Sequence, residues 1–189
     1  IDIEKDSNLL IIAIKNNNIR FTKYLFKLGI KLEDDKYINP FFETIKNNSR
    51  QLFNILLPKI KDINQKNMGE TLLTCALKYK NFKIVSSLLK HPLIDIDLPN
   101  SLGYTPLMLC SQEDYTKTLI QLLKKGADVN LYNEDWTAIN YACKHNNLEI
   151  IKLLKEYGSS KPKYSLIPKN ILPEMKTFID EWKEPLVKS

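Results

Sequence analysis

Hydrophobic, small and polar positions recur along this chain with a period of 31 to 34 residues. Five segments open with Asn or Thr, namely Asn8, Asn39, Thr71, Thr105 and Thr137. Two residues after each start the side chain is apolar, and five after it is small: Ala13, Thr44, Ala76, Cys110 and Ala142. Seventeen after each start it is leucine: Leu25, Leu56, Leu88, Leu122 and Leu154. The chain is therefore an array of five related units.

The pattern predicts two short helices in each unit. Asn and Thr accept hydrogen bonds from the first free amides of a helix, and Pro40 and Pro106 follow two of the starts, where proline costs no hydrogen bond. The small residue lets the first helix approach its neighbour closely. The leucine belongs to the second helix and packs along the stack. The sequence thus predicts an all-α solenoid of helix–turn–helix units.

Units four and five resemble the ankyrin repeat family. Unit four reads Gly103-Tyr-Thr-Pro-Leu and then Leu122-Leu-Lys-Lys-Gly-Ala-Asp-Val-Asn130, and unit five repeats it with Trp136-Thr-Ala-Ile and Gly158. The glycine 21 residues after the Thr suits a left-handed helix cap. The family's histidine after Thr-Pro-Leu is missing from all five units. The resemblance implies hairpin-like loops between the units and a curved solenoid with a concave groove.

The organisation predicted is an ankyrin repeat array over residues 1–163 and a C-terminal extension over residues 164–189. In the extension, Met175, Phe178, Ile179 and Trp182 place one apolar face on a helix over residues 173–183. We expect this helix to cap unit five; the alternatives are a helix that inserts into a partner's groove and, from Leu172-Pro-Glu-Met, the opening of an F-box-like segment. Residues 1–4 read like residues 94–97, the tail of unit three, so a preceding unit is expected, with residues 9–14 partly exposed.

Composition argues against catalysis. The five glycines are too far apart for a phosphate-binding loop, and two histidines cannot build an HExxH zinc site. Cys75, Cys110 and Cys143 fall on the first helices at core positions, where thiols are normally inert. No catalytic residue, cofactor or metal is predicted, so the chain is not expected to be an enzyme. Unpaired cysteines favour a reducing, cytoplasmic location, or a host cytosol for a secreted effector.

Charge and hydropathy narrow the choice of partner. The net charge is +6, but acidic residues are interspersed throughout, so nucleic-acid binding is disfavoured. The longest apolar run, residues 9–14, cannot span a bilayer, so no membrane partner is expected.

Candidate binding residues lie at variable positions of the repeat. Seven residues after the starts, lysine occurs in four units, and the resemblance points this position into the groove. Eight residues after the starts lie Asn16, Asn47, Tyr79, Glu113 and His145. One residue before the starts lie Ser7, Ile38, Glu70, Tyr104 and Trp136, which the resemblance places on loops over the groove, with Leu102 nearby. The predicted binding residues are Lys46, Lys78, Tyr79, Leu102, Tyr104, Glu113, Trp136, Lys144 and His145.

The function predicted is that of a non-catalytic protein-interaction module acting as adaptor, scaffold or inhibitor. A lysine ladder beside aromatic anchors suits an acidic or mixed acidic-apolar segment of another protein. One alternative is the targeting arm of a larger or secreted effector protein. The other is a nucleic-acid binder, which the net charge of +6 and the lysine ladder favour.

Overall fold

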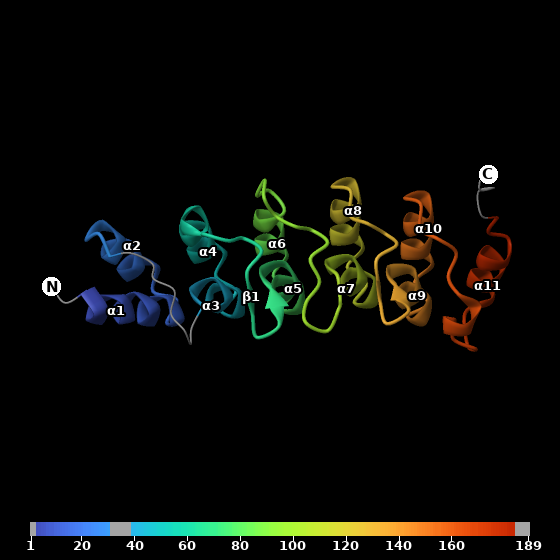
Figure 1. Ribbon diagram of the computed structural model, residues 1–189, viewed down its shortest axis with the longest axis horizontal. Helices are drawn as coiled ribbons and strands as arrows, with labels where there is room; N and C mark the ends of the chain where they lie inside the picture. Colours follow the sequence, from blue (N-terminus) through green and yellow to red (C-terminus); the bar gives the residue numbers. More distant parts are fainter. Residues whose placement is uncertain (1–2, 31–38, 184–189) are drawn as a thin grey trace. The chain divides into compact units, whose positions relative to one another are not determined.

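The computed structural model describes residues 3–30 and 39–183, and the chain divides into two compact units, Ile1–Ile94 and Asp95–Ser189 (Figure 1). We call them the first and the second compact unit. Helices dominate both, as the repeat predicted, and the two short sheets are hairpins within the loops.

The first compact unit contains three consecutive helix pairs. Its elements are α1 (Ile3–Lys15), α2 (Ile19–Lys27), α3 (Pro40–Lys46), α4 (Arg50–Leu56), the 3₁₀ helix η1 (Leu57–Lys59), β1 (Lys66–Asn67), β2 (Glu70–Thr71), α5 (Leu72–Lys78) and α6 (Phe82–Leu88). Helix α3 packs against both α1 and α5. Strands β1 and β2 pair antiparallel, with Lys66 opposite Thr71. Met68 and Gly69 between them both have positive φ, as a tight type I′ turn requires.

The second compact unit contains two helix pairs and the extension. Its elements are α7 (Pro106–Gln112), α8 (Thr116–Lys124), β3 (Tyr132–Asn133), β4 (Trp136–Thr137), α9 (Ala138–Lys144), α10 (Leu148–Glu156), the 3₁₀ helix η2 (Tyr164–Leu166) and α11 (Pro173–Asp180). Helix α9 packs against α7, and α10 packs against α8 and α9. Strands β3 and β4 pair antiparallel, with Asn133 opposite Trp136.

The predicted helix starts are confirmed in four units, at Asn39, Thr71, Thr105 and Thr137, and the expected cap hydrogen bond in the first three of these. The side chain of Asn39 accepts from the Phe41 amide at 3.1 Å, and the hydroxyls of Thr71 and Thr105 accept from amides three residues on, at 3.0 and 3.2 Å. Thr137 differs, because its amide and hydroxyl both donate to Oδ1 of Asn140, at 3.1 and 2.8 Å. Each arrangement fixes the entry of the first helix.

The predicted cap at Asn8 is wrong, because α1 already begins at Ile3 and Asn8 lies inside it. Residues 3 and 4, which were expected to form a loop tail, are therefore helical. Acidic residues favour a first helical turn, and no proline or glycine interrupts residues 3–8, so the helix extends toward the N-terminus. The expected partial exposure is confirmed, with Leu9 41% and Ile12 52% accessible.

The repeated core positions are confirmed as the core. The five column leucines are at most 3% exposed, and the five small residues at most 2%. Where glycine follows the second helix, at Gly29, Gly126 and Gly158, its φ is 85° to 87°. The next amide then bonds back to the carbonyl of the column leucine, as Ala127 does to Leu122 at 3.1 Å. The leucine position thus packs the stack and also terminates its helix.

Helix α11 ends three residues earlier than residue 183, the predicted end, and its apolar face is covered. Met175, Ile179 and Trp182 are buried. The Lys155 ammonium of α10 lies 4.6 Å from the ring centroid of Phe178 and 4.9 Å from that of Trp182. These contacts support the cap interpretation, and the division of the chain at residue 163 stays a prediction.

Leu88→Ala should lower the free energy of unfolding by about 2–5 kcal/mol, because the side chain is fully buried and its removal leaves a cavity. Leu93→Ala, in the same compact unit but at 73% exposure, should change it by less than about 0.5 kcal/mol. Urea unfolding followed by circular dichroism measures both, and equal effects would contradict the assigned core.

Candidate functional site

The loop tip of the fourth repeat is held against the hairpin of the fifth by Asn133. Its Nδ2 donates to the Leu102 carbonyl at 3.3 Å, and its Oδ1 accepts from the Tyr141 hydroxyl at 2.9 Å. Gly103, with φ of 79°, lies so close that a Cβ there would stand 2.9 Å from Cβ of Asn133. Glycine is therefore required by both the backbone conformation and the close approach. The tip is fixed in position by the next repeat.

We call the two hydrogen bonds of Asn133 the clamp. Three rings form an aromatic cluster next to it: Tyr104, Trp136 and Tyr141. The Tyr141 ring is the centre, with its centroid 5.4 Å from Tyr104 and 5.2 Å from Trp136. The Lys144 ammonium stands 5.5 Å from the Trp136 ring centroid, within the range of a cation–π interaction. Tyr141 is buried, whereas the other two rings are half-buried and offer part of their surface to solvent. The cluster is thus a preformed amphipathic surface.

The Tyr141 phenol is set up as a neutral hydrogen-bond donor. The pKa of Tyr141 is raised to about 12, mainly by burial and also by the neighbouring Tyr104 hydroxyl, while the hydrogen bond to Asn133 lowers it. A raised pKa means that the neutral form contributes its stability fully below the ordinary value of about 10, and that this contribution is lost as the pH rises toward 12. The clamp is therefore intact throughout the neutral range.

Two large side chains of the second compact unit are exposed on the two segments that Asn133 joins, the loop tip and strand β3. Leu102 on the loop tip is 75% exposed, and Tyr132 on β3 is 73% exposed. The structure therefore brings four of the predicted residues into one neighbourhood: Leu102, Tyr104, Trp136 and Lys144. Apolar side chains held in water beside rigid rings are typical of protein-binding surfaces.

Two further predicted residues, Glu113 and His145, lie at the C-caps of α7 and α9 and are exposed. Tyr79 occupies the same place at the end of α5 but belongs to the first compact unit. The predicted patch is therefore divided between the two units. All three residues occupy the C-cap of the first helix of their repeat, and their side chains are accessible to solvent there.

The predicted lysine ladder is partly neutralised in the first compact unit. The Lys46 ammonium lies 3.1 Å from Glu43, and Lys78 lies 3.2 Å from Glu70. The hydrogen bond to Glu43 raises the pKa of Lys46, against the smaller effect of desolvation. Each lysine is also the last residue of its helix, where a cation interacts favourably with the helix dipole. This position therefore presents paired charges rather than a uniformly positive face.

Sequence reasoning missed Asn133 and Tyr141, the residues that order the aromatic cluster. Tyr141 falls four residues after the fifth start, where the other units have Ile12, Glu43, Cys75 and Leu109. Because the residue type at this repeat position does not recur, the repeat pattern gave no indication of the role of Tyr141. The usable signal is the pair Tyr104 and Trp136 at one repeat position, since rings there need a partner on the helix that follows.

The three cysteines are buried thiols whose reactive thiolate form is disfavoured. Cys75, Cys110 and Cys143 are free and buried, and burial raises the pKa of Cys75 and of Cys143 to about 12. Burial raises the pKa of Cys110 as well. No group of three His, Cys, Asp or Glu side chains suited to a metal ion occurs in the described part of the chain.

None of the helices within residues 3–30 and 39–183 combines the length and the apolar character needed to cross a membrane.

A stack of helix pairs with hairpin loops, glycine caps and small-residue contacts defines a helical repeat protein. The family model for ankyrin repeats (3 copies) matches residues 10–100, 41–133 and 92–165. The chain belongs to the ankyrin repeat family. Ankyrin repeats are in general protein–protein interaction modules, and domains of this kind are typically non-enzymatic.

Among its relatives is the ankyrin repeat protein FPV031 of fowlpox virus, 33% identical over 160 residues, which are 78% of this chain and 47% of that protein. The Ankyrin repeat and SAM domain-containing protein 6 of Rattus norvegicus is 35% identical over 44% of this chain and 10% of its own length. The Ankyrin repeat and KH domain-containing protein mask-1 of Caenorhabditis elegans is 28% identical over 79% of this chain and 6% of its length. The chain spans less than half of each.

Gly103→Ala should destabilise the protein more than Gly126→Ala. Both glycines have positive φ, 79° and 85°, so alanine at either position costs about 1 kcal/mol of backbone strain. At Gly126 an added Cβ would meet no atom within 4 Å. At Gly103 the added methyl must also displace Asn133, at a further cost of about 1–3 kcal/mol. Thermal and urea unfolding of the two variants compare them directly. Equal losses would show that the loop tip does not depend on this contact.

The three thiols should resist modification in the folded protein. Because burial disfavours the thiolate, a disulfide reagent at pH 8 should label the native chain at least about a hundredfold more slowly than the chain in denaturant. Three equivalents should react after unfolding, one for each cysteine. Rapid labelling of one thiol under native conditions would show that its helix is open to solvent.

Proposed function

We propose that this chain is a non-catalytic protein-interaction module in which the aromatic cluster of the second compact unit captures a partner protein, as an adaptor, scaffold or inhibitor does. The observation that carries the proposal is the arrangement of Tyr104, Trp136 and Tyr141 with Lys144 over the Trp136 ring. Aromatic anchors already ordered in the free protein lose little conformational entropy on binding. The family supports the coarser role, and the geometry supports this surface.

The surface favours a partner segment that is both acidic and apolar. Leu102 and Tyr132, at 75% and 73% exposure, can cover apolar side chains of the partner. Lys144, whose ammonium lies 5.5 Å from the Trp136 ring centroid, can also pair with a carboxylate of the partner. In the first compact unit Lys46 and Lys78 already pair with Glu43 and Glu70, so a uniformly acidic partner would meet both signs of charge there. A mixed segment is thus the better fit.

A second role is the binding arm of a longer protein. Its support is the coverage of the relatives, since this chain spans 47% of FPV031 and much less of the proteins whose names include SAM and KH domains. In that role the aromatic cluster would select the target and another domain would act on it. Sequencing the complete transcript tests this role, and an open reading frame without any further domain would contradict it.

We place the chain in a reducing compartment, the cytoplasm or the cytosol of a host cell. The support is chemical: three buried cysteines remain free thiols, which suits a compartment that keeps thiols reduced. Fractionation with an antibody against the chain would test this, and recovery from the secreted or lumenal fraction alone would contradict it.

The partner-binding surface is tested by photo-crosslinking from Tyr132, which directly precedes Asn133 on β3 and is 73% exposed. A photoreactive phenylalanine analogue in place of Tyr132 should crosslink a protein in cell extract. Trp136→Ala combined with Tyr104→Ala should reduce that product at least about thirtyfold, because each anchor is expected to contribute 1–2 kcal/mol or more. Circular dichroism should show that the double variant remains folded.

The matched control carries the same photoreactive residue in place of Tyr157, a tyrosine of the second compact unit that is 44% exposed at the end of α10. It should give a different or no product, and Tyr157→Ala should leave the Tyr132 crosslink unchanged. An equal yield from wild type and the double variant would overturn the proposed surface.

A further inference from the structure

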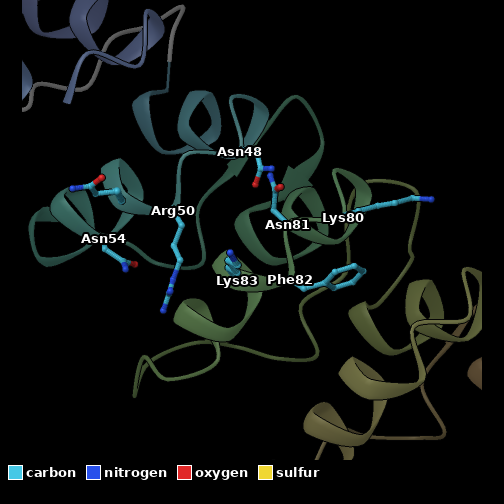
Figure 2. A pocket seen from close by; sticks show the side chains of 8 residues that line it. Asn48, Arg50, Asn54, Lys80, Asn81, Phe82 and Lys83 are labelled. Carbon is cyan, nitrogen blue, oxygen red and sulfur yellow. The ribbon is translucent and has the colours of Figure 1, made fainter.

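A pocket in the first compact unit is lined by two consecutive copies of the same repeat turn. Its volume is about 640 Å³, and its walls are Asn48, Arg50, Gln51, Asn54, Lys80, Asn81, Phe82 and Lys83 (Figure 2). Asn48 and Lys80 hold equivalent left-handed turns, with φ of 51° and 56°, just before α4 and α6. The Asn81 side chain joins the two turns by donating to the Ile45 carbonyl. The pocket is therefore built on fixed backbone.

The lining carries three cations and no carboxylate. Arg50, Lys80 and Lys83 have no carboxylate within ion-pair distance among the described residues, in contrast to Lys46 and Lys78. The remaining lining residues are neutral, and most of them are amides. Unneutralised like charges around a hollow concentrate a positive potential inside it and attract an anion.

The repeat supplies an internal comparison, because the same turns recur in the second compact unit. There the left-handed position before α8 is Asp114, whose carboxylate accepts from the Thr116 hydroxyl at 3.0 Å and from the Asn147 amide. The first turn of α10 adds Glu149. The fold therefore does not require basic residues at these positions. The basic pocket is a property of the second and third repeats.

The side chains match a phosphate group better than a single carboxylate. Arg50 and Asn54 are four residues apart on one face of α4, and Figure 2 shows Lys80 extending away from Arg50 and Lys83. A guanidinium can bind two phosphate oxygens side by side, and a dianion balances several cations at once. The volume exceeds that of one phosphate and leaves room for neighbouring peptide groups.

We propose that this basic pocket binds a phosphorylated serine or threonine side chain in a segment of a partner protein. The amides of Asn48, Gln51 and Asn54 can bond the peptide backbone, and Phe82, at 41% exposure, offers apolar surface to an adjacent side chain. A phosphorylated peptide can use the cationic, the amide and the apolar side chains of the pocket together. The proposal is independent of the aromatic cluster, which belongs to the other compact unit, so either can fail alone.

The test measures fluorescence anisotropy of two labelled peptide libraries with degenerate flanks, one with a central phosphoserine and one with serine, against the full chain. The phosphorylated library should bind at least about tenfold more tightly. Arg50→Gln combined with Lys83→Gln should abolish that preference. Lys124→Gln combined with Lys125→Gln removes the same charge from exposed positions on the second unit and should change the affinity less than about twofold. Amide signals of residues 48–51 and 80–83 should shift on binding.

Three outcomes would overturn the proposal. Equal binding of the two libraries would show no phosphate recognition. Equal losses in the two double variants would show a long-range charge effect without a pocket. Binding to vesicles with phosphoinositide headgroups or to an oligonucleotide, with loss in the Arg50 and Lys83 variant but no preference for the phosphorylated library, would assign the pocket to a lipid or nucleic-acid phosphate instead.

Discussion

Each compact unit depends on the close approach of its successive first helices, as of α3 to α1 and α5 and of α9 to α7, and one small side chain in each repeat permits that approach. Ala13, Thr44 and Ala76 are almost completely buried, and so are Cys110 and Ala142. A larger side chain there would force the helices apart and expose the leucine column, which is where most of the apolar surface is removed from water. Cys110 and Cys143 are best understood in the same way, as small apolar groups whose burial suppresses ionisation.

Hydrogen bonds between neighbouring loops couple adjacent repeats. Asn64 donates to the Leu93 carbonyl at 2.9 Å, and Asn130 donates to the Gly158 carbonyl and accepts from the Ser160 amide, at 3.2 and 2.9 Å. Asp97, at the equivalent place, accepts from the Asp128 amide at 3.2 Å. Desolvation raises the pKa of Asp97, and the nearby carboxylates add to this effect, so an asparagine suits the position better. Coupling thus remains local to adjacent repeats.

The sequence was sufficient for the repeated core positions and insufficient for features that depend on particular contacts. The columns of Leu122 and Ala142 predicted the core, because five copies of one pattern identify a position that packing constrains. The start of α1 escaped, because a cap residue such as Asn8 is a weak local signal that helix-forming neighbours override. The role of Tyr141 and the pairing of Lys78 with Glu70 escaped as well, because both depend on contacts across a loop that no spacing encodes. The role of a residue that does not recur can be assigned only from the residues that it contacts in the folded chain.

The same distinction explains where binding can arise in this protein. The core columns must be kept in every unit, so they cannot carry specificity. The turn before the second helix is fixed in backbone but free in side chain, as Lys80 and Asp114 illustrate with opposite charges at one repeat position and nearly identical φ, 56° and 57°. The residue before each start is equally free, and there Tyr104 and Trp136 share a partner ring. A repeat fold therefore separates stability from recognition, so a basic pocket and an aromatic surface can be built on one scaffold without altering its core.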